Sequence, residues 1–282
     1  MIIIRQADLL QKIVLSQKKE QRSVGFVPTM GALHAGHLSL LALCRAQTDL
    51  SICSIFINPT QFNETADLDK YPRTPAEDQE ALDHGGCDIL FMPAEEEVYP
   101  QGRDQSPQVD LGGLDQVLEG EFRPGHFAGV VQVVSRLLDI TRPDKVFMGQ
   151  KDYQQFAIIR RMIAEQARSV DLVMGPTVRE PDGLAMSSRN LRLSADFRAR
   201  ANLLYASLQE AKNKMGQHTI PEIEASALEQ LRAAGFRPEY FSIVHAHTLQ
   251  KPRPGNTDSP LVACVAAWAG KVRLIDNLLL KA

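Results

Sequence analysis

The stretch FVPTMGALHAGHLSL, residues 26–40, runs from an apolar, β-branched segment through a turn of small residues into a run with helical spacing. Proline and glycine mark the turn, and Leu38 and Leu41 mark one face of the helix that follows. A strand that leads through a tight turn into a helix is the unit from which parallel α/β sheets are built. This stretch therefore predicts the class of the fold. It also raises the question of what His34 and His37 do in the turn.

The same alternation of strand and helix continues through the first part of the chain. Short apolar segments that are typical of strands occupy residues 23–27, 50–57, 88–92, 144–148 and 169–174. Helical spacing occupies residues 38–45, 130–138 and 152–167. This order predicts an α/β fold, a Rossmann-like parallel sheet covered on both faces, in an N-terminal domain of residues 1–175.

A different pattern begins at residue 176. Consecutive helices are predicted over residues 194–215 and 221–234, followed by strands over 240–246, 261–269 and 271–277. This arrangement predicts a smaller α+β domain of residues 176–282. The segment PTVREPDGLAMSSRN, residues 176–190, is the expected hinge because it concentrates proline, glycine and serine.

Composition narrows the classes of function. The 282 residues include 31 Lys and Arg against 34 Asp and Glu, which gives a formal net charge of −3. This balance argues against a nucleic-acid partner, although a local basic pocket for a small anion stays open.

Targeting and redox signals are absent from the sequence pattern. Arg5 and Asp8 interrupt the N-terminal apolar run too early for a signal peptide, and the apolar run at 261–269 is shorter than the roughly 20 residues of a membrane helix. We therefore expect a cytoplasmic protein without a membrane partner. The cysteines form no C-x-x-C pair and are expected to be reduced and mostly buried: Cys44, Cys53, Cys87 and Cys264.

The turn in residues 26–40 allows several kinds of site. Gly31 and Gly36 have the spacing of a phosphate loop, but His37 and Leu38 replace its lysine and its serine or threonine, so a P-loop is excluded. Backbone N–H groups and the helix dipole are still expected to face an anion at this helix start. Two alternatives remain: a metal site that includes both His34 and His37, and an ordinary polar turn. The metal site is disfavoured because structural zinc sites usually need four ligands.

Further polar loops follow other predicted strands or lie at the expected hinge. NPTQF, GQKDYQQ and MSSRN occupy residues 58–62, 149–155 and 186–190. In open α/β sheets, ligands bind beyond the carboxyl ends of the strands. Lys151 and Arg189 are cations suited to phosphate oxygens, although each loop alone also fits a solvated polar turn.

These motifs resemble those of known proteins. The H-x-G-H of the first turn and M-S-S-R at the domain junction resemble the nucleotidyltransferase superfamily that includes class I aminoacyl-tRNA synthetases. The full set resembles the pantothenate synthetase family, the pantoate–β-alanine ligases. It comprises FVPTMGALHAGHLSL, FINPTQF, YPRT, EGEFRPGHFAGV, FMGQKDYQQ and REPDGLAMSSRN, which cover residues 25 to 190 in the order of that family. One departure from the wider superfamily is Ala185, where a lysine often precedes M-S, and it shifts the cationic role toward Lys151 and Arg189.

The resemblance implies a reaction in coenzyme A biosynthesis. ATP with Mg²⁺ and pantoate give pantoyl adenylate and pyrophosphate, and β-alanine then displaces AMP to form pantothenate. It implies small-molecule substrates and a homodimer, with the N-terminal domain binding nucleotide and pantoate and the C-terminal domain acting as a lid.

The resemblance also implies roles for individual residues. His37 matches the proton donor of the family, and His34, Lys151 and Arg189 are the expected supporting catalytic residues. Gln61 and Gln155 match contacts to pantoate, with Gln61 also expected to contact β-alanine, and Asn58, Arg123 and His126 are second-tier members of the pocket. No protein ligand of a metal is assigned. The ATP-binding set is Met30, Gly31, Ala32, Leu33, His34, Ala35, Gly36, His37, Gly149, Gln150, Lys151, Asp152, Val178, Met186, Ser187, Ser188 and Arg189.

Rival functions share part of this pattern. A nucleotidyltransferase that adenylylates a small phosphate acceptor would share the histidine turn but would need more basic residues and less amide chemistry. A non-catalytic nucleotide-sensing module would need the ATP loops but neither Lys151 nor the glutamines. A tRNA synthetase is disfavoured because no sizeable basic region follows residue 190.

Overall fold

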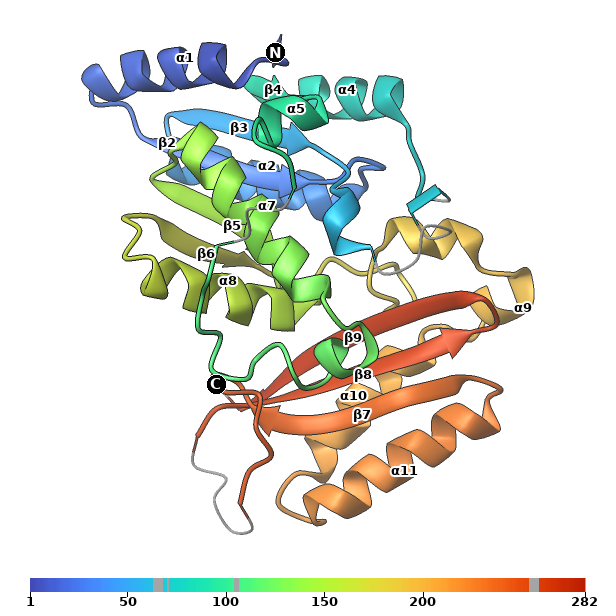
Figure 1. Ribbon diagram of the computed structural model, residues 1–282. Coiled ribbons are helices and arrows are strands. Elements are labelled where there is room, and N and C mark those ends of the chain that lie inside the picture. Colours follow the sequence, from blue (N-terminus) through green and yellow to red (C-terminus); the bar gives the residue numbers. More distant parts are fainter. Residues whose placement is uncertain (63–67, 70, 104–106, 254–258, 282) are drawn as a thin grey trace. The chain divides into compact units, whose positions relative to one another are not determined.

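The computed structural model describes residues 1–62, 68–69, 71–103, 107–253 and 259–281 (Figure 1). The chain forms two compact units. Unit 1 comprises Met1–Leu111, Arg123–Gly149 and Ile158–Pro176, and unit 2 comprises Gly112–Phe122, Gln150–Ala157 and Thr177–Ala282. Unit 2 thus also takes in two short segments that precede residue 176 in the sequence.

Unit 1 is built on a six-stranded sheet with the order β1-β4-β3-β2-β5-β6, in which every pair is parallel. The predicted parallel α/β fold is confirmed. The strands are β1 (Ile2–Ile4), β2 (Val24–Thr29), β3 (Leu50–Ile55), β4 (Ile89–Phe91), β5 (Lys145–Gly149) and β6 (Asp171–Gly175). Strand β1 was not predicted, because three apolar residues at the start of the chain carry no period.

Helices cover both faces of this sheet. Val27 packs in one cluster with Leu40 and Leu41 of α2, whereas the alternating Phe26 is fully buried and, by the period of two, points to the opposite face. Helices α1 and α7 contact one another and β2. The helices are α1 (Ala7–Lys19), α2 (Ala35–Gln47), α4 (Pro75–His84), α5 (Glu95–Val98), α7 (His126–Thr141) and α8 (Tyr153–Glu165), of which α8 continues from unit 2.

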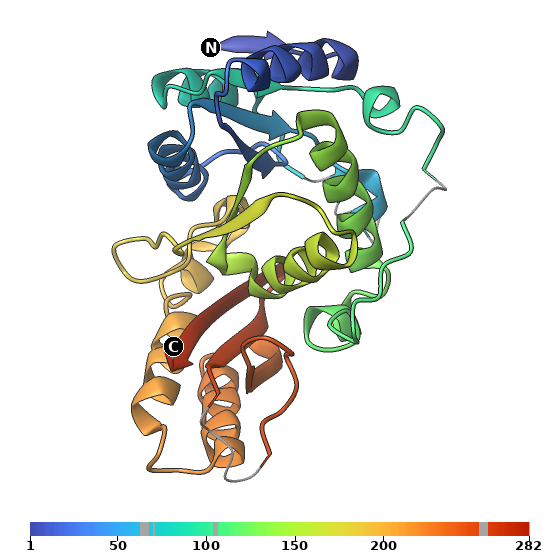
Figure 2. The same ribbon diagram turned by 90° about the vertical axis from the view of Figure 1, so that its left-hand side faces the viewer.

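Unit 2 contains the antiparallel sheet β7-β8-β9 (Figure 2). Its strands are β7 (Arg237–His245), β8 (Leu261–Ala269) and β9 (Val272–Lys281), and its helices are α6 (Glu119–Phe122), α9 (Ala195–Arg198), α10 (Leu203–Lys214) and α11 (Ile220–Ala233). The helix predicted over residues 194–215 is interrupted between α9 and α10. Alternate residues of β8, such as Ala263 and Val265, pack in one apolar cluster with Leu208 and Leu231 of α10 and α11.

Of the helices in the described ranges, none combines the length and the hydropathy that a bilayer-spanning segment requires.

Candidate functional site

The turn of residues 30–34 lies where the order of the parallel sheet reverses. Strand β2 pairs with β3 on one side and with β5 on the other. From β2 the following strands β3 and β4 are added toward one edge of the sheet, whereas β5 and β6 are added toward the other edge. The crevice outside the carboxyl ends of two such strands is the usual ligand site of an open α/β sheet. The topology therefore places the histidine turn at the position where a ligand is expected.

Buried polar groups fix the backbone of this turn. Gly31 and Ala32 both adopt a positive φ, of 80° and 51°. The Gly31 N–H donates to Thr29 Oγ1 at 3.2 Å, and the N–H groups of Ala32 and Leu33 donate to the carboxylate of Asp78 at 2.9 and 2.7 Å. Asp78 lies in the first turn of α4 and is 3% exposed.

These bonds correct one expectation about the turn. Its backbone N–H groups were expected to face an anion, yet those of Gly31, Ala32 and Leu33 donate within the chain. An anion at this helix start must therefore be met by other groups, foremost the side chains. Asp78 was missed by sequence reasoning because an acidic residue in a first helical turn ordinarily faces solvent.

His34 and His37 form a reciprocal cap at the start of α2. His34 is the N-cap residue, and its Nδ1 accepts from the Gly36 N–H at 3.1 Å. The His34 N–H donates in return to Nδ1 of His37 at 3.3 Å, and the ring centroids are 4.1 Å apart. Helix capping, which these residue types rarely provide, therefore accounts for the spacing of the two histidines.

The cap also determines which ring nitrogen carries the proton. A ring nitrogen that accepts a hydrogen bond carries no proton of its own. In the neutral imidazoles Nδ1 is therefore unprotonated, and Nε2 carries the hydrogen. Each ring thus presents a donor on the side remote from its cap. Both side chains are partly exposed.

Gln61 is held beside this turn by Asn58. Gln61 ends the short 3₁₀ turn η1 (Pro59–Gln61), and its Nε2 donates to Met30 Sδ at 3.0 Å. Asn58 is 1% exposed, and its Nδ2 donates to Gln61 Oε1 at 3.3 Å and to the Gly129 carbonyl at 3.1 Å. The structure therefore brings the predicted residues Met30, Asn58 and Gln61 together within unit 1.

His126 supports the same turn from the start of α7. Its Nδ1 lies 2.8 Å from the Gln61 carbonyl oxygen, and its Nε2 lies 3.0 Å from NH1 of Arg123. Since a carbonyl can only accept and a guanidinium can only donate, the neutral imidazole carries its proton on Nδ1. Arg123 and His126 therefore lie beside Gln61, and their membership of a substrate pocket stays a prediction.

Close packing between α7 and η1 depends on one glycine. A Cβ atom at Gly129 would lie 2.4 Å from the Thr60 carbonyl oxygen and 2.8 Å from Gln61 Cα. Tyr99 closes the group by donating to Asn58 Oδ1 at 2.9 Å, and burial raises its pKa to about 12. The phenol is therefore a permanent donor at neutral pH.

Unit 2 carries the second set of predicted residues. Lys151 and Asp152 lie in the 3₁₀ turn η2 (Gln150–Asp152), with 3.7 Å between Lys151 Nζ and Asp152 Oδ1. Gln155 is partly buried in the first turn of α8. Its neighbour Gln154 is 5% exposed and binds the backbone of Leu114, Val117 and Glu119.

The segment 178–190 forms a small closed loop. Arg179 pairs with Ala185 in an isolated bridge, and the Met186 N–H donates to the Val178 carbonyl at 3.0 Å. Ser187 caps the 3₁₀ turn η3 (Ser188–Arg192) by accepting from the Arg189 N–H at 3.3 Å. The motif MSSR is therefore presented at a capped helical start.

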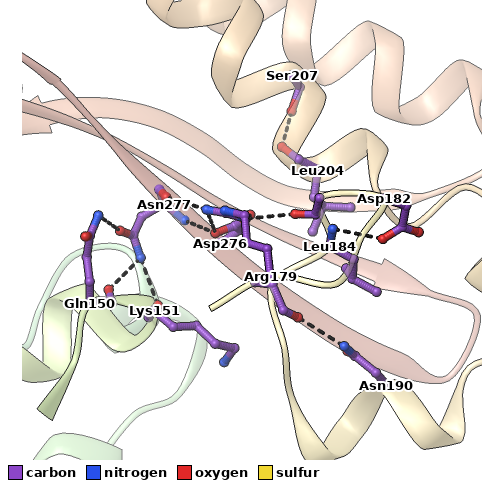
Figure 3. A network of polar contacts seen from close by, with 12 residues as sticks. Gln150, Lys151, Arg179, Asp182, Leu184, Asn190, Leu204, Ser207, Asp276 and Asn277 are labelled. Atoms are coloured by element: carbon purple, nitrogen blue, oxygen red, sulfur yellow. Dashed lines mark hydrogen bonds and ion pairs between the residues drawn. The ribbon is translucent and has the colours of Figure 1, made fainter. Parts of the chain in front are cut away.

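A buried ion pair anchors this loop to β9 (Figure 3). The Arg179 guanidinium donates to both carboxylate oxygens of Asp276 at 2.6 and 3.1 Å, and it lies 3.6 Å from the ring centroid of Tyr205. Burial raises the pKa of Asp276, and the guanidinium opposes that shift. The next residue, Asn277, binds the turn that carries Lys151.

Segment 112–122 is tied to the same sheet by charge. Arg273 donates to both oxygens of the Glu119 carboxylate at 2.6 and 2.7 Å, and Tyr240 donates to Oε1 of the same group at 2.6 Å. Arg273 also pairs with Glu239 at 2.7 Å. This buried network explains why a segment far away in the sequence belongs to unit 2.

The predicted residues thus form two local groups. Unit 1 holds His34, His37 and Gln61, and unit 2 holds Lys151 and Arg189. Sequence reasoning missed Asp78, Tyr99, Asp276 and Asn277. The available signal was that the predicted strand KVRLIDN carries charged residues within it, Arg273 and Asp276.

Within the described ranges, no group of three or more His, Cys, Asp and Glu side chains could hold a metal ion.

Comparison with known proteins gives a consistent result. The family model of pantoate-beta-alanine ligase matches residues 2–279. A pantothenate synthetase of Thioalkalivibrio sulfidiphilus is 50% identical over 257 residues, which is 90% of this chain and 89% of that protein.

Solved structures agree over the full length. The crystal structure of pantothenate synthetase from Thermus thermophilus gives a TM-score of 0.92 at 39% identity, with 100% of both chains covered. A pantoate-β-alanine ligase from Francisella tularensis, solved in complex with β,γ-ATP and β-alanine, gives 0.83 at 34% identity, with 100% of this chain and 98% of that chain covered. The resemblance seen in the motifs is confirmed. The chain belongs to the pantoate–β-alanine ligase family, the enzymes that form the amide bond of pantothenate from pantoate and β-alanine.

Proposed function

We propose that the chain performs this ligation through a pantoyl adenylate. A carboxylate oxygen of pantoate attacks the α-phosphorus of ATP, and the bond to pyrophosphate breaks. The amine of β-alanine then attacks the activated carbonyl carbon, the bond to AMP breaks, and the nitrogen releases a proton. The relative from Francisella tularensis, which was solved with β,γ-ATP and β-alanine, supports both ligands for this chain.

The observation that carries the proposal is the orientation of the two imidazoles at the switch point of the sheet. Because Nδ1 of His34 and of His37 accepts a backbone N–H, each neutral ring carries its proton on Nε2, and we assign these two donors to phosphate oxygens. Fixed donors of this kind stabilise the charge that grows on the leaving pyrophosphate.

Full proton transfer from His37 needs one further step. An acidic imidazolium carries protons on both nitrogens, and a proton on Nδ1 would face the His34 N–H that now donates to it. Proton donation by His37 therefore requires that this cap bond opens. Hydrogen-bond donation from Nε2 requires no such change, so we assign this role to the resting geometry.

The remaining predicted residues enter the proposal by chemistry. Lys151 and Arg189 neutralise phosphate charge, while Gln61 and Gln155 offer a donor and an acceptor each to the hydroxyls and carboxylate of pantoate. We also assign Gln61 a contact with β-alanine. We assign contacts with ATP to the turn of residues 30–37 and to the segments 149–152, 178 and 186–189.

Mg²⁺ enters the proposal with ATP, held by phosphate oxygens and water, and it supplies charge neutralisation. The Asp78 carboxylate beside the histidine turn already accepts from the N–H groups of Ala32 and Leu33 and from the Thr74 hydroxyl, so we assign it no metal bond.

An oxygen-transfer experiment tests the intermediate. The purified protein is incubated with ATP, Mg²⁺, β-alanine and pantoate labelled with ¹⁸O in the carboxylate, and AMP is examined by mass spectrometry. We expect AMP formation that depends on pantoate, with one ¹⁸O in its phosphate. Unlabelled AMP, or ADP in its place, would rule out the adenylate.

Assembly and motion complete the proposal. We assign the chain a homodimeric state. The molar mass measured by light scattering after size-exclusion chromatography tests this assignment.

We also assign residues 176–282 the role of a lid that closes over ATP around the hinge at 176–190. Scattering profiles that are identical with and without nucleotide would contradict the lid.

A further inference from the structure

Asn277 uses its whole side chain to hold the turn that carries Lys151. Its Nδ2 donates to the carbonyl of Gln150 at 2.9 Å and to that of Lys151 at 2.8 Å, and its Oδ1 accepts from Gln150 Nε2 at 3.3 Å (Figure 3). Asn277 is 2% exposed. A buried amide with these bonds satisfied defines the backbone position of η2.

The strand geometry makes Asn277 a link between two loops. Successive side chains of a strand point to opposite faces of the sheet, so the side chains of Asp276 and Asn277 lie on opposite faces of β9. Asp276 holds Arg179 at the base of the loop 179–190, and Asn277 holds η2. The Asn277 N–H also donates to Asp276 Oδ1 at 2.8 Å.

Further hydrogen bonds fix the loop 179–190. Arg179 donates to the Gly183 carbonyl at 3.1 Å as well as to Asp276, and Asn190 Nδ2 donates to the Ala185 carbonyl at 3.0 Å. The middle of β9 therefore contacts both segments of unit 2 that carry a cation assigned to phosphate, the turn η2 with Lys151 and the loop 179–190 with Arg189.

We propose that Asn277 is a positioning residue for Lys151 in adenylation. The proposal rests on the proposed function, because it assumes that Lys151 meets the phosphates of ATP. Asn277 itself touches no reacting atom. It acts by fixing the backbone from which the Lys151 side chain extends, and a displacement of about 1 Å at such a position is enough to slow a reaction on the order of a hundredfold.

Two variants and a matched control separate this role from general stability. Asn277→Ala removes all the bonds, and Asn277→Asp keeps the shape but replaces the donor with an oxygen that repels the carbonyls of Gln150 and Lys151. Ser207→Ala is the control, since Ser207 is 1% exposed and donates only within α10, to the Leu204 carbonyl at 2.8 Å.

The first measurement is hydrogen exchange of the peptide that covers residues 148–156, and it does not depend on any reaction. We expect exchange in this peptide to rise about tenfold or more in both Asn277 variants, because the turn opens locally, and to stay at the wild-type rate in Ser207→Ala. Unchanged exchange in the Asn277 variants overturns the anchoring, whatever the protein catalyses.

The second measurement is single-turnover adenylation at saturating ATP and pantoate. We expect Asn277→Ala to slow it about tenfold to a hundredfold, but less than about threefold in a Lys151→Ala background, because residues that act through one another are not additive. Equal losses in both backgrounds show a merely structural role and overturn the proposal. A wild-type protein without pantoate-dependent AMP formation refutes the proposed function instead, and the exchange result still stands.

Discussion

At the scale of single residues, the absence of a side chain at Gly129 allows α7 to pack closely against the turn that carries Gln61. The glycine lies within α7, where a Cβ would meet the carbonyl of Thr60 in the turn that carries Gln61. The motif that contains Gly129 is visible in the sequence, but the approach of η1 to it is not, because it depends on the packing of segments that are far apart in the chain.

Gly129→Ala provides a test in which two effects have opposite signs. Helix propensity alone would stabilise the variant by about 1 kcal/mol. The clash with Thr60 instead predicts a loss of about 1–3 kcal/mol, as overpacking does, together with a raised KM for pantoate. Urea unfolding and steady-state kinetics measure both. Ala128→Gly, at an exposed neighbouring position, gives the propensity term alone, and a stabilised Gly129→Ala would contradict the packing argument.

At the scale of elements, strands β2 to β6 of unit 1 were predicted, whereas strand β1 and the helices α1, α4, α5 and α6 were not. Apolar β-branched runs carry a strong signal, so residues 23–27, 50–57 and 144–148 overlap β2, β3 and β5. Helix α4 was missed although it begins with proline and acidic residues. Helix α6 has four residues, and its position depends on Glu119 and its distant partner Arg273.

The cap of α2 can be separated from the chemistry of its histidines. Asparagine is a strong N-cap residue, so His34→Asn is expected to keep the free energy of unfolding within about 0.5 kcal/mol, whereas His34→Ala loses about 1 kcal/mol. Both variants should slow adenylation, since both lose the Nε2 donor. Denaturation and single-turnover rates measure these effects.

Helix α11 supplies the control for that comparison. Thr219 and Glu222 form a capping box there, so Thr219→Ala should lose about 1 kcal/mol without slowing adenylation. If His34→Asn retains the wild-type rate, His34 has no role in the reaction.

The attachment of segment 112–122 can be tested through its ion pair. Glu119→Gln removes one of the two carboxylates that pair with the buried Arg273 in the described part of the chain, so we expect a loss of about 3 kcal/mol or somewhat less in urea unfolding. Asp196→Asn, which removes an exposed pair with Arg200, should cost at most about 0.5 kcal/mol. Equal effects of the two substitutions would show that the buried network does not stabilise unit 2.

At the scale of the whole molecule, the cysteines report on the two units separately. All four thiols are buried, as expected from the sequence, with Cys44, Cys53 and Cys87 in unit 1 and Cys264 in unit 2. Burial raises the pKa of Cys44 from its ordinary 9.0 to about 11 and that of Cys87 to about 12. These thiols are therefore both shielded and uncharged at neutral pH.

Thiol labelling during unfolding follows from this distribution. At pH 8 the native protein should not react with a disulfide reagent, and rising urea should release three equivalents if unit 1 opens first or one if unit 2 does. Since unfolded thiols ionise above pH 9 and the buried ones do not, the free energy of unfolding should fall as the pH rises beyond 9. Rapid labelling of the native protein would contradict the burial.

The path of the chain between the units has a consequence for recombination. Residues 112–122 and 150–157 are encoded before residue 176 but complete unit 2, where Glu119 neutralises Arg273 and Gln154 organises the preceding loop. A chimera that exchanges only residues 177–282 with a relative would combine an inherited carboxylate with a foreign arginine and a foreign strand. A chimera that transfers all three stretches of unit 2 together keeps both contacts, so we expect it to fold more stably than the chimera that exchanges residues 177–282 alone.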